Sequence, residues 1–247
     1  AKAVKTASDI ENLIADQLQK IQREPANVNY RRALADLYAR AERYDEALAA
    51  LEEADRISGG GDPQIDRAIS QIRVRKYDAA IQQAQAAGDE ARAAALEAEK
   101  KEYIFANAQE RVKRYPNDLQ FKYELGVLLF ERGMYTEAIQ QFQQSQRNPQ
   151  RRTRSLYYLA RCFEEKGQLD IAAEQLEKAA SELSILDNTK KDILYELGIV
   201  YERMGRSDKA VELFKEIYAV DISFRDVAQR IERYYKSPPA GGAAPAS

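Results

Sequence analysis

The stretch YELGVLLFERGMYTEAIQQF at residues 123–142 occurs in related form two more times along the chain. Its relatives are YYLARCFEEKGQLDIAAEQL at residues 157–176 and YELGIVYERMGRSDKAVELF at residues 195–214. In all three copies a leucine is followed by a small residue, and successive copies start 34 and 38 residues apart. An internal repeat of this length is typical of folds that stack one structural unit several times.

Each copy has the pattern expected of two helices joined by a tight turn. Twelve positions after the first small residue comes a second one, and a large apolar residue follows four positions later, as in Ala138 and Phe142. The small residue lets the second helix approach the first, and the large residue fills the space between them. The turn carries a glycine, which can take the left-handed conformation that ends a helix. The turn glycines are Gly133, Gly167 and Gly205.

This pattern resembles the tetratricopeptide repeat, in which W-x2-L-G-x2-Y, A-x3-F and a proline recur over 34 residues. An N-terminal copy is similar: Leu34-Ala35 and Tyr38 are followed by Ala47 and Leu51, with Glu42 in place of the turn glycine. The resemblance implies an all-α fold, a right-handed α-solenoid of about five helix-turn-helix repeats with a C-terminal capping helix. The tryptophan position departs from the family pattern and holds Arg31, Lys122, Leu156 and Leu194.

The middle of the chain follows the pattern less closely. Asp62-Pro63 predicts a helix start, and we interpret residues 62–84 as a weak second repeat with alanines 68, 80 and 84 at its small positions. Residues 89–114 contain neither glycine nor proline, which favours one long helix or two nearly fused ones. The triglycine at residues 59–61 is a hinge candidate that would divide an N-terminal block from the rest.

Amphipathic segments close both ends of the array. Residues 8–23 predict a helix without a preceding partner, and residues 223–235 predict a capping helix with Phe224, Val227, Ile231 and Tyr234 on one face. The Pro- and Ala-rich end is expected to be disordered. The expected segments are an N-terminal helix plus first repeat (8–61), a degenerate repeat and long helix (62–117), three strong repeats (118–222), a capping helix (223–236) and a disordered tail (237–247).

The composition argues against most enzymes and against nucleic-acid binding. The 247 residues include no histidine and a single cysteine, Cys162, so the commonest general base and every multi-cysteine zinc site are missing. The 38 Lys and Arg residues are balanced by 40 Asp and Glu residues, which leaves no broad basic field for nucleic acid or an anionic membrane. We therefore expect no catalysis, cofactor or metal site. No apolar run reaches the ~20 residues of a spanning helix, so we expect no membrane insertion and a cytoplasmic location.

In tetratricopeptide proteins the first helices of successive repeats line a concave groove that binds peptides or partner segments. Carried over to this sequence, the groove face holds Gln120, Tyr123, Glu124, Val127 and Phe130, then Arg154, Tyr157, Tyr158, Arg161 and Glu165, then Asp192, Tyr195, Glu196, Ile199 and Arg203. The residues expected to bind the partner are Tyr123, Val127, Phe130, Arg154, Tyr157, Tyr158, Arg161, Tyr195 and Ile199.

Tyrosine and arginine suit a binding groove because each combines a large contact area with a directional polar end. The alternative is that Tyr123, Tyr157 and Tyr195 fill the seams between repeats, so that only Tyr158 is accessible. The sequence leaves both interpretations open.

Several arginines gather before the second strong copy, at positions 147, 151, 152 and 154. Positive charge at a helix start opposes the helix dipole by about 0.3–1 kcal/mol per charge, so these residues do not stabilise that helix. Together with Arg161 they would form a basic strip for an acidic segment or a carboxylate terminus. The alternative is a set of exposed arginines partly neutralised by Glu164 and Glu165.

The sequence thus predicts a non-catalytic scaffold that binds another protein, as an extended or acidic segment, in the groove of residues 118–203. The alternative is a structural segment of a longer or self-associating solenoid with no separate ligand. A helical-repeat RNA binder would read bases from its first helices, but the acidic balance of the chain disfavours it.

Overall fold

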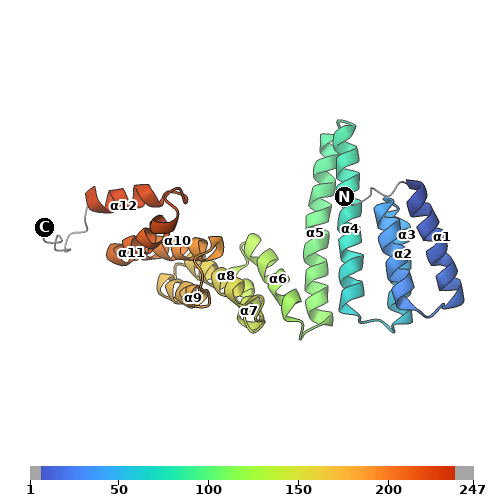
Figure 1. The fold of residues 1–247 in the computed structure, drawn as a ribbon, viewed down its shortest axis with the longest axis horizontal. Helices are drawn as coiled ribbons and strands as arrows, with labels where there is room; N and C mark the ends of the chain where they lie inside the picture. Colours follow the sequence, from blue (N-terminus) through green and yellow to red (C-terminus); the bar gives the residue numbers. More distant parts are fainter. Residues whose placement is uncertain (1–6, 237–247) are drawn as a thin grey trace. The chain divides into compact units, whose positions relative to one another are not determined.

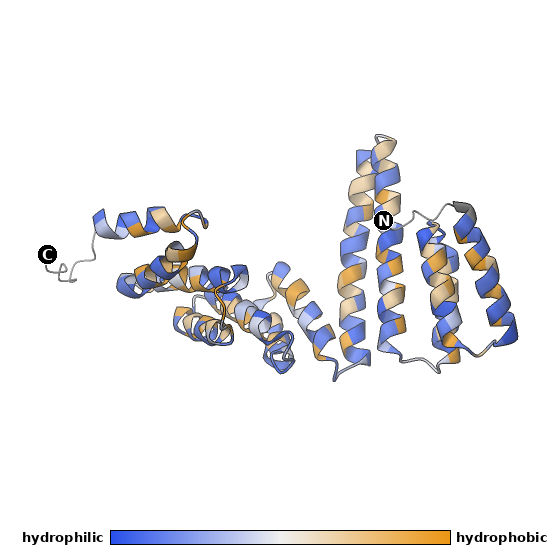
Figure 2. Cartoon of the chain, in the orientation of Figure 1, coloured by the Kyte–Doolittle hydropathy of each residue, from blue (hydrophilic) through white to orange (hydrophobic). Residues whose placement is uncertain are grey.

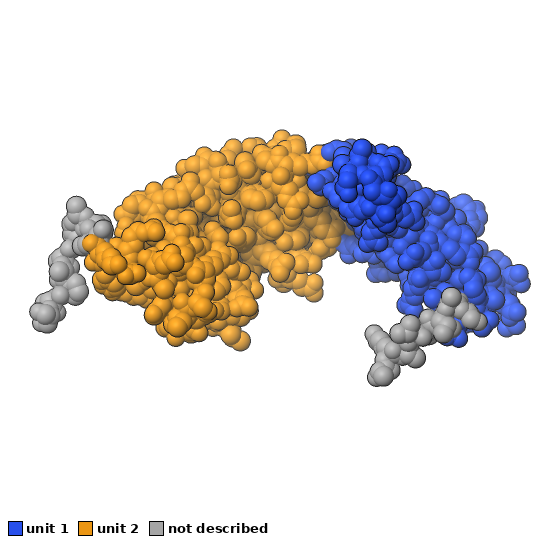
Figure 3. All heavy atoms as spheres, turned by 90° about the horizontal axis from the view of Figure 1, so that it is seen from above, with its two compact units in different colours: residues 1–117 blue, residues 118–247 orange. Residues whose placement is uncertain are grey.

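The computed structural model describes residues 7–236, which form twelve helices and no strand (Figure 1). The tail expected to be disordered, 237–247, lies outside the described residues. The chain divides into two compact units, residues 1–117 and residues 118–247 (Figure 3). Apolar and polar residues alternate along the helices (Figure 2), as in helices that are buried on one side only.

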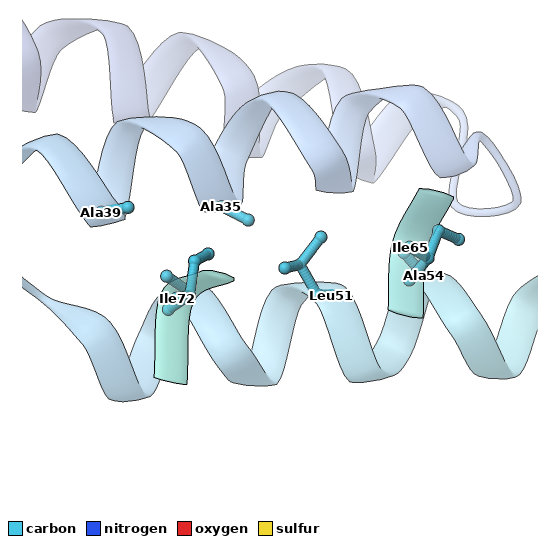
Figure 4. Packing of buried hydrophobic residues seen from close by; sticks show 7 residues of the cluster. Ala35, Ala39, Leu51, Ala54, Ile65 and Ile72 are labelled. Carbon is cyan, nitrogen blue, oxygen red and sulfur yellow. The ribbon is translucent and has the colours of Figure 1, made fainter. Parts of the chain in front are cut away.

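Unit 1 is a stack of five helices in which each helix packs against the next one in the chain. They are α1 (Ala7–Arg23), α2 (Val28–Arg40), α3 (Tyr44–Ile57), α4 (Pro63–Ala86) and α5 (Glu90–Arg114). Its main core joins α2, α3 and α4: Ala35 and Ala39 point from α2 towards Leu51 of α3, and Ile65 and Ile72 of α4 complete the cluster (Figure 4).

Carboxylate and amide side chains begin several helices at the positions that the sequence indicates. Asp62 accepts a hydrogen bond from the backbone N–H of Gln64 at 2.8 Å, and Pro63 occupies the first turn of α4. Asp118 accepts from two backbone N–H groups at the start of α6. These bonds satisfy N–H groups that have no partner inside the helix.

The turn of the first repeat has the geometry of the glycine turns although it contains Glu42. Glu42 has φ 60°, in the left-handed region, and the backbone N–H of Arg43 donates to the Tyr38 carbonyl at 2.9 Å. The same bond closes the turn at Gly133, where Met134 donates to Leu129 at 2.9 Å. A side chain in this conformation costs about 1–2 kcal/mol, so Glu42 is a strained position in an otherwise regular repeat.

The weak second repeat expected at residues 62–84 is wrong, because α4 is a single helix of 24 residues without a turn. No glycine or proline interrupts residues 64–86, and the helix buries Ile65 and Ile72 in the cluster with α2 and α3 and Ile81 in a second cluster with residues of α5. The helix packs against α5, which is one helix of 25 residues, as the lack of breakers at 89–114 predicts. One long hairpin therefore stands where a degenerate repeat followed by a long helix was expected.

The triglycine at residues 59–61 is a turn inside unit 1 and does not divide compact units. All three glycines have positive φ, and the chain reverses there between α3 and α4. Ala54, before the turn, and Ile65, after it, belong to the same buried cluster. The division falls instead after Asn117, in the segment that joins α5 to the next helix.

Unit 2 contains three helix pairs followed by one more helix, again packed in chain order. Its helices are α6 (Leu119–Glu131), α7 (Tyr135–Ser145), α8 (Arg152–Glu165), α9 (Leu169–Ser181), α10 (Asn188–Arg203), α11 (Ser207–Val220) and α12 (Val227–Lys236). The three turn glycines each have φ 73°, and the second small residues, Ala138, Ala172 and Ala210, are buried.

The residues that face each other across a helix pair are matched in size. A Cβ atom on Gly126 would lie 2.7 Å from Cε1 of Phe142, and one on Gly198 would lie 2.5 Å from Cε1 of Phe214. Where the first helix has alanine, the second has a smaller apolar residue: Leu176 accompanies Ala160, and Leu51 accompanies Ala35. Glycine permits phenylalanine, and alanine requires leucine, because the space between the helices is close-packed.

The capping helix α12 begins at Val227, four residues later than the expected start at 223. Arg225 has φ 46°, a left-handed conformation that a helix cannot contain. Phe224 therefore lies in the turn before the helix, while Val227 is fully buried against the array. The helix caps the last repeat as expected, but the segment before it forms a separate structural feature.

Replacing Glu42 by glycine should raise the free energy of unfolding by up to about 1 kcal/mol. The substitution removes left-handed strain, and the greater freedom of glycine in the unfolded chain offsets part of the gain. Urea denaturation followed by far-ultraviolet circular dichroism measures the change. As a control, Ala49→Gly inside α3 should lower the same free energy by about 1 kcal/mol. A loss of stability in Glu42→Gly would show that the backbone at Glu42 is not strained.

Gly126→Ala should destabilise unit 2 by about 1–3 kcal/mol, because the added methyl overlaps the Phe142 ring. Phe142→Leu alone leaves a cavity and also destabilises. The double variant should be more stable than the sum of the two losses predicts, with a coupling of about 1 kcal/mol or more. A double-mutant cycle by urea denaturation tests this. Additive losses would contradict the size matching.

Candidate partner-binding site

The first helices of the three repeats in unit 2 line a pocket of about 220 Å³. We call it the groove pocket. Helices α6, α8 and α10 supply most of its wall, and the turn before α12 supplies Arg225. The lining residues are Tyr123, Thr153, Arg154, Tyr157, Tyr158, Thr189, Asp192, Ile193 and Arg225. The structure thus brings together four of the residues expected to bind a partner: Tyr123, Arg154, Tyr157 and Tyr158.

An aromatic cluster forms one wall of the groove pocket. The ring of Tyr158 stacks on Phe142 with centroids 5.1 Å apart and 9° between the planes. Its edge contacts are with Phe130 at 5.5 Å, Tyr157 at 5.8 Å and Tyr123 at 6.2 Å. Burial raises the pKa of Tyr158 above its ordinary value. The wall is therefore a packed surface anchored to the buried Phe142, which fixes the direction of the tyrosine side chains.

The four tyrosines of the expected groove divide into two kinds. Tyr123 and Tyr195 are buried, at 8% and 9% exposure, and fill seams of the array as the alternative interpretation predicts for them. Tyr157 and Tyr158 are only half-buried, and both line the groove pocket. The second helix pair thus supplies the accessible tyrosines.

Tyr195 takes part in attaching the cap instead of lining the groove pocket. Its hydroxyl donates to Asp226 at 2.5 Å, and burial raises its pKa. The guanidinium groups of Arg225 and Arg230 lie 4.5 and 5.5 Å from its ring centroid. Such cation–aromatic contacts attach the turn before α12, and α12 itself, to α10.

Three other expected residues do not line the groove pocket. Phe130 is half-buried between Tyr158 and Tyr135, with the latter ring centroid at 5.6 Å. Val127 and Ile199 are partly exposed on α6 and α10. They therefore extend the same face of the helices beyond the pocket.

The arginine cluster expected to form a basic strip is partly paired within the fold. Arg151 donates to Gln120 at 2.6 Å, and Arg152 pairs with Glu182 at 2.8 Å. Arg161 lies 3.2 Å from Glu164 and donates to the Tyr157 hydroxyl at 3.3 Å. Arg152 and Arg161 are thus paired with carboxylates, whereas the bond of Arg151 to a neutral amide leaves its charge in place.

Arg154 differs from those arginines. It is exposed, it lines the groove pocket, and within residues 7–236 no carboxylate lies at ion-pair distance from it. Glu164, which could neutralise a neighbour, already pairs with Arg203 at 2.5 Å. One guanidinium is therefore available beside the two accessible tyrosines.

Arg225 is the lining residue that the repeat pattern did not indicate. It pairs with Asp192 at 2.8 Å and with Glu196 at 3.0 Å, and its left-handed backbone directs it to α10. Thr153, Thr189 and Ile193 were missed as well. Arg225 lies outside every repeat. In the sequence, only its positive charge next to the helix start at 227 could have indicated that it lines the pocket.

The geometry is that of known repeat proteins. A sequence model described as tetratricopeptide repeat matches residues 7–62, and a second model with that description matches residues 154–182 and 192–219. No curated protein matches the chain. The chain is an all-α tetratricopeptide-repeat family protein. Members of this class generally act as non-catalytic scaffolds for interactions with other proteins.

Solved structures of the same fold include three at 20% identity or less. YrrB, described as a TPR protein with an unusual peptide-binding site, has a TM-score of 0.59 at 15% identity, over 88% of this chain and 97% of that one. MamA (41-end) from Desulfovibrio magneticus RS-1 gives 0.52 at 20%, over 85% and 97%. The Naa15/Naa10 complex bound to HypK-THB gives 0.52 at 13%, over 93% and 32%. At these identities the likeness shows the fold.

None of the helices in residues 7–236 combines the length and apolar character needed to span a membrane.

The Cys162 thiol should not react with alkylating reagents in the folded protein. It is fully buried in α8, and burial raises the pKa of the thiol from 9.0 to about 12. Because the thiolate is the reactive form, iodoacetamide labelling at pH 8, followed by mass spectrometry, should be at least about 100-fold slower than in urea. Equal rates in both conditions would show that α8 is not packed as described.

Proposed function

We propose that unit 2 binds an extended segment of another protein in the groove pocket. The observation that carries this proposal is the convergence of three successive first helices on two half-buried tyrosines and the unpaired Arg154. Tyrosine and arginine contribute strongly to protein interfaces. The cytoplasm is the compartment in which we expect this binding.

The chemistry of the groove pocket defines the segment that it would take. The rings of Tyr157 and Tyr158 offer faces and edges to an apolar or aromatic side chain. Arg154 suits a carboxylate, because its guanidinium can donate two parallel hydrogen bonds. Hydroxyl groups of Thr153 and Thr189 can bond to the backbone of an extended chain. An acidic residue next to an apolar one would therefore fit.

Contacts between the repeats support a groove that exists before the partner arrives. Arg151 joins α8 to Gln120 of α6, and Arg203 joins α10 to Glu164 of α8. Arg225 ties the turn before α12 to Asp192 in the pocket wall. Fixing these side chains in the free protein reduces the entropy lost on binding.

Self-association is the second candidate, and exposed apolar residues near the end of α11 favour it. Val220 and Ile222 are 61% and 68% exposed, and they flank Asp221, which is fixed by Lys191 at 2.7 Å. Large apolar side chains of this exposure in a short segment can mark a surface for a second copy.

The groove variant Arg154→Ala/Tyr157→Ala should retain the fold and lose the partner. Both residues line the pocket without being fully buried. Proteins captured by the full chain from a lysate of the source cell are identified by mass spectrometry. Binding of the recombinant partner is then titrated, and its affinity should fall at least about tenfold, since two central contacts are removed.

The matched control for this variant is Glu174→Ala/Lys178→Ala on α9. These two side chains pair with each other at 2.6 Å and are more than half exposed, outside the groove pocket. Their removal should leave the affinity unchanged. Equal affinity of the groove variant and the wild type would overturn the proposal. Self-association would be supported instead if light scattering showed that the wild-type chain is a dimer and that the Ile222→Asp variant is a monomer.

A further inference from the structure

Unit 1 contains a second pocket, of about 480 Å³, on helices that do not take part in the groove. We call it the hairpin pocket. It lies on α4 and is bordered by α3 on one side and α5 on the other. The lining residues are Leu48, Arg73, Lys76, Tyr77, Ala80, Arg92, Leu96 and Tyr103. Its volume falls in the range of ligand-binding pockets, about 300–1,000 Å³.

The pocket exists because neighbouring helices differ in length. Helix α3 has 14 residues, while α4 and α5 have 24 and 25 and extend past the start of α3 (Figure 1). The part of the hairpin that α3 covers ends at Leu48, near the start of α3. Beyond it, the hairpin has a thin core of Ile81, Ala84, Ala93 and Leu96, with Tyr77 and Ala80 packed on it. A step therefore forms where α3 begins.

The floor of the hairpin pocket is apolar and aromatic. Tyr77 of α4 and Tyr103 of α5 lie with ring centroids 6.0 Å apart. Leu48, Ala80 and Leu96 complete this floor from three helices. An apolar side chain placed on it would be removed from water on several sides, which stabilises binding by roughly 25 cal/mol per Å² of buried apolar surface.

Three cations surround this floor. The Arg73 guanidinium lies 5.8 Å from the Tyr103 ring centroid and 3.3 Å from Glu52. Lys76 pairs with Asp45. For the Arg92 side chain, no carboxylate of residues 7–236 lies at ion-pair distance. The pocket thus places positive charge from two helices around an apolar centre.

The carboxylates that pair with Arg73 and Lys76 can be exchanged at little cost. The side chains of Glu52 and Asp45 are 57% and 78% exposed. Ion pairs of this exposure contribute about 0–1 kcal/mol. Incoming carboxylates can therefore replace them, and one more can pair with Arg92.

From this geometry we propose that the hairpin pocket binds a second protein segment, one with an apolar side chain flanked by acidic residues. The apolar side chain inserts over Tyr77 and Leu96, and the flanking carboxylates pair with Arg73, Lys76 and Arg92. The occupant follows from charge complementarity and the apolar floor. Its residues all belong to unit 1, so this site shares no residue with the groove pocket.

The test uses the full chain with the groove variant Arg154→Ala/Tyr157→Ala as its background, so that the groove pocket does not contribute, and an array of short peptides. Each peptide has one central residue, Leu, Ile, Phe, Tyr, Trp or Ser, flanked by Asp and Glu, and a matched set carries Asn and Gln. The acidic peptides with an apolar centre should bind, at least about tenfold more tightly than their Asn/Gln or Ser-centred analogues. In this background, Arg73→Glu/Arg92→Glu should abolish the difference.

The control variant Arg56→Glu/Lys113→Glu makes the same change of charge in unit 1. Both side chains are more than 70% exposed, each is in an ion pair, and neither lines the hairpin pocket. Introduced into the same background, it should leave binding of the array unchanged. Because the groove contacts are removed from every protein in the comparison, the result does not depend on whether the groove proposal is right.

Three results would overturn the hairpin-pocket proposal. One is that no acidic, apolar-centred peptide binds. Another is that binding persists in Arg73→Glu/Arg92→Glu when circular dichroism shows an intact fold. The third is that a single-stranded oligonucleotide displaces the peptides through the same arginines, which would assign the cations to a nucleic acid.

Discussion

Contact between a small residue on one helix and a large side chain on the next determines the form of every regular repeat in this protein. Gly126 leaves room for Phe142 in one pair, and Gly198 leaves room for Phe214 in another. The contact sets the spacing of the paired helices, and repeated pairing places the first helices of unit 2 next to one another. Tyr158, which stacks on Phe142, reaches the groove pocket from this buried contact. The binding surface is thus a direct consequence of the core.

Interruptions of the repeat pattern create the features that distinguish this chain. The continuous helix α4 replaces a turn, so that a long hairpin passes the start of α3 and leaves the hairpin pocket. The left-handed Arg225 interrupts the entry to α12 and brings a guanidinium into the wall of the groove pocket. In both units, a departure from the regular repeat places cationic and aromatic side chains around an apolar surface.

The fold could be predicted from the sequence because its determinants are local. The left-handed turn at Glu42 and the long helix α5 follow from spacing and from the lack of breakers alone. The turn expected within residues 62–84 is absent, because alanines at repeat spacing are equally compatible with one continuous helix. Site residues depend on neighbours that are distant in the sequence. The pairing of Arg152 with Glu182, or of Arg225 with Asp192, requires the positions of other helices, which no local pattern contains.

Photo-crosslinking determines whether the partner contacts the face made by the first helices of unit 2. A benzoylphenylalanine placed at Tyr157, on α8 in the groove pocket, is compared with one placed at exposed Glu174 on α9. We expect the partner to be crosslinked from position 157 and not from position 174. Crosslinking from position 174 alone would contradict this expectation and would assign binding to the second helices.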